Sequence, residues 1–173
     1  VLRRLDCVLE PTKQNVLAYL PETKKLSPEA ADVVLKRKAK LSFFNNSRYD
    51  FQKLLADPND IASNLRNYIN GFSKNARSIL DNFSFDENIK RLDKSDLLYM
   101  VVKRFAEVDL HPDKISNIGM GYVFEELIRK FADLSNETAG EHFTPREVIR
   151  LMVNLLFLND KGVLTKKGIV KTL

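Results

Sequence analysis

The 173-residue chain has little of the chemistry from which disulfide-bonded or metal-binding domains are built. Its single cysteine, Cys7, permits no disulfide within the chain, and the apolar neighbours of Cys7 predict a buried side chain rather than a nucleophile. With only His111 and His142 beside that cysteine, we expect no metal site. No apolar run reaches the roughly 18 residues of a membrane-spanning helix, and the first residues lack the layout of a signal peptide. We therefore expect a cytoplasmic protein with no membrane partner.

The composition is that of an ordinary globular protein with a basic balance. Hydrophobic residues make up 44% of the chain and charged residues 29%. A net charge of +5 and a pI of about 9.3 allow an anionic partner such as DNA. The densest basic run, residues 36–40, is by itself more typical of a solvated helix face than of a phosphate contact.

Apolar residues recur at helical spacing along most of the chain. Ile61, Leu65, Ile69 and Phe72 follow at steps of four, four and three, which predicts one buried helix face. Six glycines and six prolines leave little room for a turn-rich sheet. Only residues 168–173 have the pattern of a strand start. The sequence thus predicts an all-α segment that leads into a domain of a different, α/β architecture.

Several local signals predict where helices begin and end. Pro11 is expected to end a first helix, because proline cannot donate to the helical hydrogen-bond ladder. Ser27, followed by proline and an acid, predicts a helix start, and Asp50 is expected to cap a short helix. Asp57 and Asp93 are expected to open two later helices.

Residues 144–147, of sequence T-P-R-E, are a complete helix-start signature. The Thr144 hydroxyl can accept from an amide of the first turn, Glu147 can reach back to the Thr144 amide, and Pro145 occupies the first helical position. Free N–H groups at such a helix start favour an anion, such as a phosphate or a carboxylate. Taken alone, the signature predicts a capped helix and no more.

The surrounding residues extend this signature into a family resemblance. Residues 140–148 resemble the motif G-x-[FY]-[FY]-T-P-x-x-[VIL] that precedes the cofactor loop of γ-type amino-methyltransferases. Residues 2–9, 64–73 and 121–131 resemble, in the same order, blocks of the modification (M) subunit of type I restriction–modification systems, an N6-adenine DNA methyltransferase. The resemblance implies a helical N-terminal domain over residues 1–118 and the beginning of the methyltransferase domain over residues 119–173.

The resemblance also implies a cofactor, S-adenosyl-L-methionine, and residues that help to bind it. These residues are Glu141, His142, Phe143, Thr144, Pro145 and Arg146, although His142 stands where many relatives carry an aromatic residue. The family's D-P-x-x-G-x-G-G cofactor loop and its N-P-P-[FY] motif, which binds the flipped adenine, are not in this sequence. We therefore expect the segment to be clipped at both ends, to contain no catalytic residue and not to methylate DNA by itself.

The partners implied by the resemblance are a specificity subunit, a second modification subunit, a restriction subunit in the full complex, and double-stranded DNA. Basic candidates for DNA contact are Arg3, Arg4, Lys36, Arg37 and Lys40. Arg3 and Arg4 could equally pair with acids of the same chain.

Two alternatives stay open at this point. One is a non-catalytic helical adaptor that binds protein or DNA. The other is a part of a fused enzyme that carries restriction and methylation in one chain.

Overall fold

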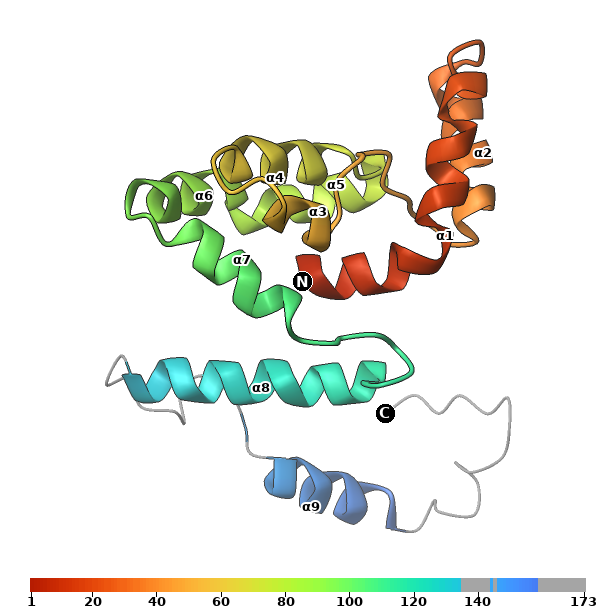
Figure 1. The fold of residues 1–173 in the computed structure, drawn as a ribbon. Coiled ribbons are helices and arrows are strands. Elements are labelled where there is room, and N and C mark those ends of the chain that lie inside the picture. The colour runs from red at the N-terminus through yellow and green to blue at the C-terminus, as the bar shows by residue number, and fades with distance from the viewer. Residues whose placement is uncertain (135–143, 145, 159–173) are drawn as a thin grey trace. The chain divides into compact units, whose positions relative to one another are not determined.

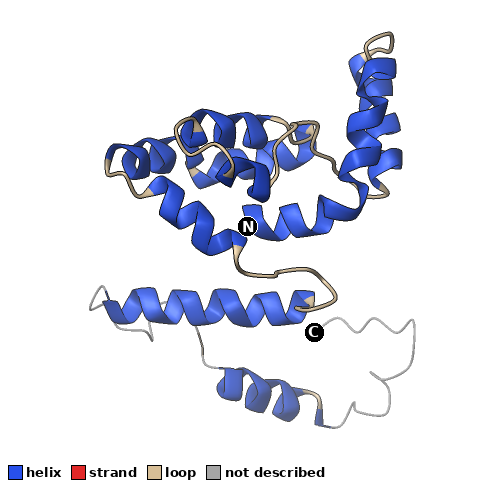
Figure 2. Cartoon of the chain, in the orientation of Figure 1, coloured by secondary structure: helices blue, strands red, loops and turns tan. Residues whose placement is uncertain are grey.

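The computed structural model describes residues 1–134, 144 and 146–158, and the chain divides into two compact units, Val1–Ser116 (unit 1) and Asn117–Leu173 (unit 2). Every regular element in the described residues is a helix, apart from one isolated antiparallel bridge between Asn45 and Phe72 (Figure 2). The prediction of an all-α segment is therefore confirmed for this part of the chain. The predicted strand start at residues 168–173 lies outside it.

Unit 1 consists of short helices joined by short loops (Figure 1). In chain order they are α1 (Leu2–Thr23), α2 (Pro28–Ala39), α3 (Phe51–Leu55), α4 (Ile61–Asn70), α5 (Lys74–Leu80), the 3-10 turn η1 (Asp81–Phe83), α6 (Phe85–Lys94) and α7 (Leu98–Ala106).

Helix α1 runs through a proline instead of stopping at it. Both Pro11 and Pro21 lie inside the helix, so the prediction that Pro11 ends it is wrong. An internal proline removes one i→i−4 hydrogen bond and crowds the carbonyl one turn earlier, which kinks a helix whose two sides are both held by packing. Figure 1 shows α1 changing direction along its length. Leu9, before Pro11, lies in one buried cluster, and Val16, after it, lies in another.

The larger cluster fills the body of unit 1, between the first half of α1 and helices α3 to α7. All four residues of the predicted stripe, three on α4 and Phe72 just after it, are at most 7% exposed, which confirms the stripe as a core face. Tyr68, on the same helix, is fully buried and packs edge-on against Phe51 at 6.1 Å and Phe72 at 5.3 Å between ring centroids. Cys7 is also buried, as its apolar neighbours predict.

The smaller cluster lies in a helical arm, which we define as residues 12–40. In Figure 1 the second half of α1 and the whole of α2 run side by side away from the body. Val16, Leu35 and Ala39 fill the interior of the arm, and Phe44 closes it at the base. Leu41 packs against both clusters and so links the arm to the body.

Two of the predicted helix starts are confirmed by their hydrogen bonds. The Ser27 hydroxyl accepts from the amide of Ala30 at 3.3 Å, and α2 begins at the next residue, Pro28. The Asp50 carboxylate accepts from the amide of Lys53 at 2.8 Å at the start of α3.

The other two predicted starts are wrong. Helix α4 begins at Ile61, and the carboxylate of Asp57 instead accepts from the side-chain amide of Asn64 at 3.0 Å. Asp93 lies in the last turn of α6, where it cannot cap the following helix. The apolar residues Phe85, Ile89 and Leu92 place the preceding segment in a helix that packs on the core and runs through Asp93, and this packing outweighs a local preference for the cap position.

Unit 2 contains helices α8 (Asn117–Leu134) and α9 (Arg146–Leu156) among its described residues. Met120 and Ala132 of α8 are buried, whereas Phe131 is 65% exposed and Leu155 of α9 is also 65% exposed. No described helix is both long enough and apolar enough to cross a membrane.

Gly71, directly after α4, marks a close approach to the segment that precedes α3. A Cβ atom built on Gly71 would lie 2.6 Å from the backbone nitrogen of Ser47 and 2.8 Å from Oδ1 of Asn45. The Gly71 φ angle of −74° is ordinary, so the reason for glycine here is space and not backbone conformation. The amide of Asn46 donates to the Gly71 carbonyl at 2.8 Å, which fixes this approach.

We expect Gly71→Ala to lower the free energy of unfolding by about 1–3 kcal/mol, because the added methyl group overpacks a site whose nearest neighbour is backbone. Thermal unfolding followed by far-UV circular dichroism measures the effect. Gly121→Ala is the matched control, since a Cβ there meets nothing within 4 Å and alanine favours the α8 helix. Equal melting behaviour of the two variants would contradict the close approach.

Candidate functional site

The predicted cofactor motif lies at the start of α9. Glu141, His142, Phe143 and Pro145 are outside the described residues. Thr144 is exposed, and Arg146 is the first residue of α9. The helix thus begins within two residues of the expected cap. Cofactor binding by these six residues stays a prediction.

Arg3 and Arg4, two of the predicted DNA contacts, are engaged inside unit 1. Nη1 of Arg3 lies 2.9 Å from the Asp6 carboxylate, and its Nε donates to the Val108 carbonyl at 3.1 Å. Arg4 donates to the carbonyls of Leu110 and Ile115, the latter at 2.7 Å. Both guanidinium groups therefore tie the segment after α7 to the start of α1.

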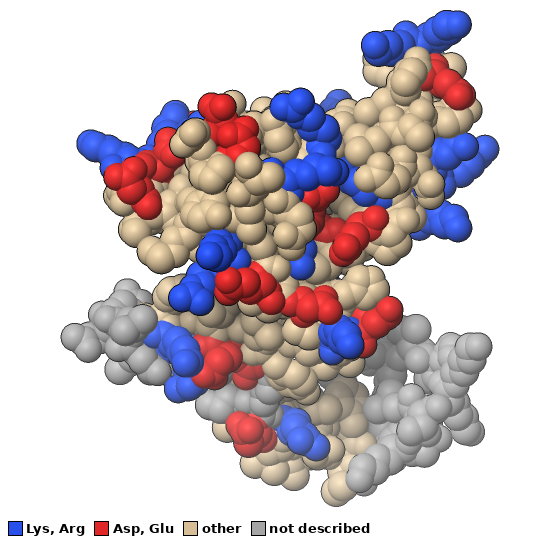
Figure 3. All heavy atoms as spheres, in the orientation of Figure 1, with Lys and Arg blue, Asp and Glu red and all other residues tan. Residues whose placement is uncertain are grey.

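The arm carries the other three basic candidates. Lys36 lies 2.6 Å from the carboxylate of Asp32, in an ion pair along α2. Arg37 and Lys40 are exposed, and their side chains form no hydrogen bond or ion pair with the described residues. Figure 3 shows basic side chains projecting from the arm. Of the five predicted DNA contacts, Arg37 and Lys40 are thus the ones available to a partner.

A buried lysine occupies the junction between the arm and the body. Lys13 is 6% exposed, and its ammonium group donates to Asn45 Oδ1 and to the Tyr49 carbonyl, both at 2.9 Å. The same ammonium lies 5.2 Å from the ring centroid of Tyr68. Burial lowers the pKa of Lys13 to about 8, against the raising effect of the carboxylates of Asp6 and Asp50.

A buried aspartate lies on the same face of α1. Oδ1 of Asp6 accepts from the Tyr68 hydroxyl at 3.1 Å, and Oδ2 accepts from the Phe51 amide at 3.4 Å and from Arg3. Burial raises the pKa of Asp6, although each of these donors opposes the rise. Burial, together with the nearby carboxylate, raises the pKa of Tyr68 well above its usual value. We call Asp6, Lys13, Asn45 and Tyr68 the polar joint.

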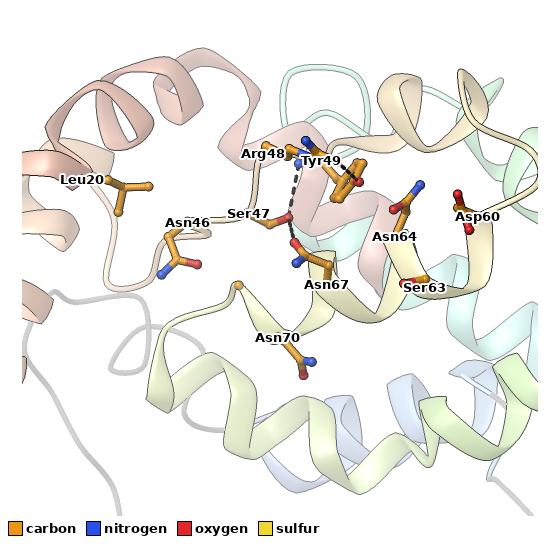
Figure 4. A pocket seen from close by; sticks show the side chains of 11 residues that line it. Leu20, Asn46, Ser47, Arg48, Tyr49, Asp60, Ser63, Asn64, Asn67 and Asn70 are labelled. Atoms are coloured by element: carbon orange, nitrogen blue, oxygen red, sulfur yellow. Dashed lines mark hydrogen bonds between the residues drawn. The ribbon is translucent and has the colours of Figure 1, made fainter.

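A polar groove of about 790 Å³ opens on the surface between α4 and residues 46–49 (Figure 4). Its lining is dominated by amides and hydroxyls, and its only charged side chains are Arg48 and Asp60. The Ser47 hydroxyl donates to Asn67 Oδ1 at 2.7 Å across the base of the groove. The polar side chains along the groove include Asn46, Arg48, Ser63, Asn64, Asn67 and Asn70.

The sequence alone predicts neither the polar joint nor the groove. A signal for the joint does exist, because Lys13 stands at a core position in the repeat Leu9, Lys13, Val16, Leu20. A polar residue at such a position needs buried hydrogen-bond partners. Those partners come from Asn45 and Tyr49, far along the chain, so no local pattern could identify them.

Comparison with known families matches both parts of the chain. Residues 1–105 match the HsdM N-terminal domain, and residues 116–167 match N-6 DNA Methylase. These matches define the class, a helical N-terminal domain followed by a DNA methylase segment. The chain belongs to the HsdM family, and its resemblance to type I modification subunits is confirmed.

One curated relative is similar over part of the chain. The methylase subunit of the type I restriction enzyme EcoEI from Escherichia coli is 28% identical over 95 residues, which cover 55% of this chain and 19% of that relative. The chain therefore spans only a small part of the length of the relative that it matches. No solved structure matches the chain.

We expect the stability of unit 1 to rise with pH between 8 and 9.5. In this window the unfolded chain keeps its Lys13 proton, whose ordinary pKa is 10.5, whereas the folded chain loses it above about 8. The unfolded state then binds more protons, so stability increases by up to about 1.4 kcal/mol per pH unit. Urea unfolding at a series of pH values measures this slope.

In Lys13→Met, the contribution of Lys13 to the slope of the unfolding free energy against pH should disappear. The control Lys94→Met, at an exposed lysine, should keep that contribution. The window stops below pH 10 because the raised pKa of Tyr68 has the opposite effect above its ordinary value of 10.0. Identical slopes in Lys13→Met and Lys94→Met would show that Lys13 does not titrate early.

Proposed function

We propose that the chain is the N-terminal part of a type I modification subunit that transfers a methyl group from S-adenosyl-L-methionine to N6 of adenine in double-stranded DNA. The observation that carries the proposal is the order of the two family matches, an HsdM N-terminal domain followed by N-6 DNA Methylase. The name of the EcoEI relative, a methylase subunit of a restriction enzyme, supports the same assignment. The partners would be a specificity subunit, a second modification subunit and a restriction subunit, in the cytoplasm.

The start of α9 is the part of this chain that we propose binds the cofactor. An exposed Thr144 two residues before the start of a helix of 11 residues fits the carboxylate of the methionine end, because the first turn of a helix presents free N–H groups and a partial positive charge. Glu141, His142, Phe143, Pro145 and Arg146 would complete this side of the pocket. When bound, the cofactor supplies the methyl group, and the residues of this chain only hold and orient it.

In the full-length subunit, Thr144→Ala should weaken S-adenosyl-L-methionine binding roughly fivefold, because loss of one hydrogen bond costs about 1 kcal/mol. Isothermal titration calorimetry measures the affinity. Assay of the subunit with its specificity subunit on duplex DNA should find the labelled methyl group on adenine N6.

Thr23→Ala is the matched control, since the Thr23 hydroxyl bonds only to the carbonyl of Leu20 in unit 1. A melting curve must accompany both variants, because loss of a helix cap also costs about 1 kcal/mol of stability. Unchanged cofactor affinity in Thr144→Ala would leave the T-P-R-E sequence as a cap alone. A label on cytosine, or no label at all, would refute the proposed reaction.

The arm is the part of unit 1 that we propose contacts DNA. Arg37 and Lys40 are exposed and not committed to partners among the described residues, whereas Arg3 and Arg4 hold the fold together. A guanidinium and an ammonium that reach phosphates release counterions, so their binding depends strongly on salt. Such contacts position the DNA and carry no sequence information.

The double variant Arg37→Gln, Lys40→Asn should weaken duplex binding uniformly across DNA sequences. It should also reduce the slope of log affinity against log salt by about 2, one for each phosphate that the variant no longer neutralises. Asparagine is chosen because Lys40 has a φ of 54°, which asparagine tolerates. Fluorescence anisotropy at several salt concentrations measures both effects. The control Lys94→Gln, Lys103→Gln removes two exposed charges outside the arm, and an equal loss of affinity there would rule out a specific contact.

A further inference from the structure

A further cavity of unit 1 lies between α4, α5 and α6, and we call it the α4–α6 cavity. Its volume is about 330 Å³, which is within the range of small-molecule sites. Three of its lining residues, Ile69, Leu80 and Ile89, are core residues that are at most 7% exposed. Phe85 also lines the cavity and packs against the same buried cluster. The cavity therefore has an apolar floor that belongs to the core.

Two arginines line the α4–α6 cavity, and each is held by an aspartate. Nε of Arg66 donates to Oδ1 of Asp86 at 2.7 Å, and Nε of Arg77 donates to Oδ1 of Asp81 at 2.9 Å. The terminal nitrogens of both guanidinium groups form no hydrogen bond with the described residues. A planar guanidinium that is restrained at Nε keeps its two terminal nitrogens for a second partner, and their fork geometry matches a carboxylate.

The two carboxylates beside the cavity are already engaged by cations. Oδ2 of Asp86 lies 2.7 Å from Nζ of Lys90, in addition to the bond from Arg66. Hydrogen bonds from Lys90 and Arg66 lower the pKa of Asp86, which keeps this carboxyl group ionised at neutral pH. Asp81 likewise accepts from Arg77. The acceptors at the cavity are therefore used within the fold, whereas donors of the arginines are not.

Ser84 adds a second kind of free donor and a strained backbone. Its φ is 48°, in the left-handed region that residues with a side chain rarely adopt, and such conformations cluster at ligand sites. Its hydroxyl and the side-chain amide of Asn70 line the cavity, and neither forms a hydrogen bond within the described part of the chain. Directly after Ser84, the ring of Phe85 stacks on that of the 45% exposed Phe83 at 5.7 Å. The apolar floor thus continues outward onto an exposed aromatic ring.

The free donors and the apolar floor together define the chemistry of the ligand. Guanidinium, amide and hydroxyl groups can all donate to one carboxylate, while the floor requires an apolar body. A nucleic acid fits less well, because Asp81 and Asp86 balance the two arginines and leave a chain of phosphates without net attraction. The volume suits a small molecule that carries one anionic group.

We propose that the α4–α6 cavity binds a small aromatic carboxylate, whose ring lies on Leu80, Phe85 and Ile89 and whose carboxylate lies between Arg66 and Arg77. The site uses residues of unit 1 alone and does not depend on the methyl-transfer reaction proposed above.

The probe for this site is 2-naphthoate, and the full chain of 173 residues is titrated with it by isothermal titration calorimetry. The neutral amide of the same ring system, 2-naphthamide, separates the contribution of the charge from that of the apolar body. We expect saturable binding of 2-naphthoate, and binding of 2-naphthamide weaker by about tenfold or more, because the amide cannot form a charge-assisted pair with an arginine.

Arg66→Gln and Arg77→Gln should each raise the Kd for 2-naphthoate about tenfold, since each removes charged donors from the cavity. Arg104→Gln is the matched control, because Arg104 also pairs with a nearby acid, Glu107, and does not line the cavity. Ser84→Gly removes only a hydroxyl, at a backbone conformation that glycine adopts freely, and should raise the Kd about threefold. Far-UV circular dichroism checks that each variant is folded, and Ser84→Gly tests the site even where an arginine variant is not.

The other outcomes overturn the proposal in different ways. Equal affinity of Ser84→Gly, the two arginine variants and Arg104→Gln would place the ligand elsewhere on the chain. Equal affinity for 2-naphthoate and 2-naphthamide would leave an apolar cavity without a site for an anion. Absence of saturable 2-naphthoate binding to the unmodified chain would remove the small-molecule ligand. If an acidic peptide with flanking phenylalanines then bound in a manner sensitive to Arg66→Gln, the cavity would belong to a polypeptide partner instead.

Discussion

The hydrogen bonds of one buried lysine hold unit 1 in its shape. Lys13 lies just after the proline that bends α1, and its ammonium group links that helix to Asn45 and Tyr49 at the edge of the body. Without partners, a buried ammonium would be strongly unfavourable. Because the fold must satisfy this group, the arm can leave the body in few directions. The apolar clusters on either side supply most of the burial, but they are non-directional, so the polar joint sets the orientation.

The sequence predicts the parts of this fold that depend on local repeats. The stripe from Ile61 to Phe72 and the caps at Ser27 and Asp50 follow from spacing and from side-chain reach within one turn. The continuation of α1 through Pro11 could not be predicted, because it depends on burial of both halves against distant residues. The same limit applies to the groove, whose walls come from α4 and from a segment about 20 residues earlier.

The basic residues show why charge in a sequence does not identify an interface. Arg3 and Arg4 are adjacent and basic at the start of an amphipathic helix, a pattern that also suits a DNA contact, yet their guanidinium groups bind main-chain carbonyls and one carboxylate of the same unit. Arg37 lies in an ordinary basic run and is free among the described residues. The difference is set by the position of the segment after α7, which no nearby residue encodes. The predicted cofactor motif is the opposite case, since its interpretation rests on its own sequence and on the family blocks around it.

The joint and the groove share atoms, so the position of the arm and the shape of the groove are linked. Asn45 Oδ1 accepts from Lys13 and also from the amide of Ser47, and the Ser47 hydroxyl in turn donates to Asn67 in the groove. The Tyr49 carbonyl accepts from Lys13 of the joint, and Tyr49 also lines the groove. Movement of residues 46–49 would therefore disturb the bonds of Lys13, and movement of the arm would shift one wall of the groove. These hydrogen bonds run between directly bonded neighbours, so the polar joint and this wall of the groove form one connected network.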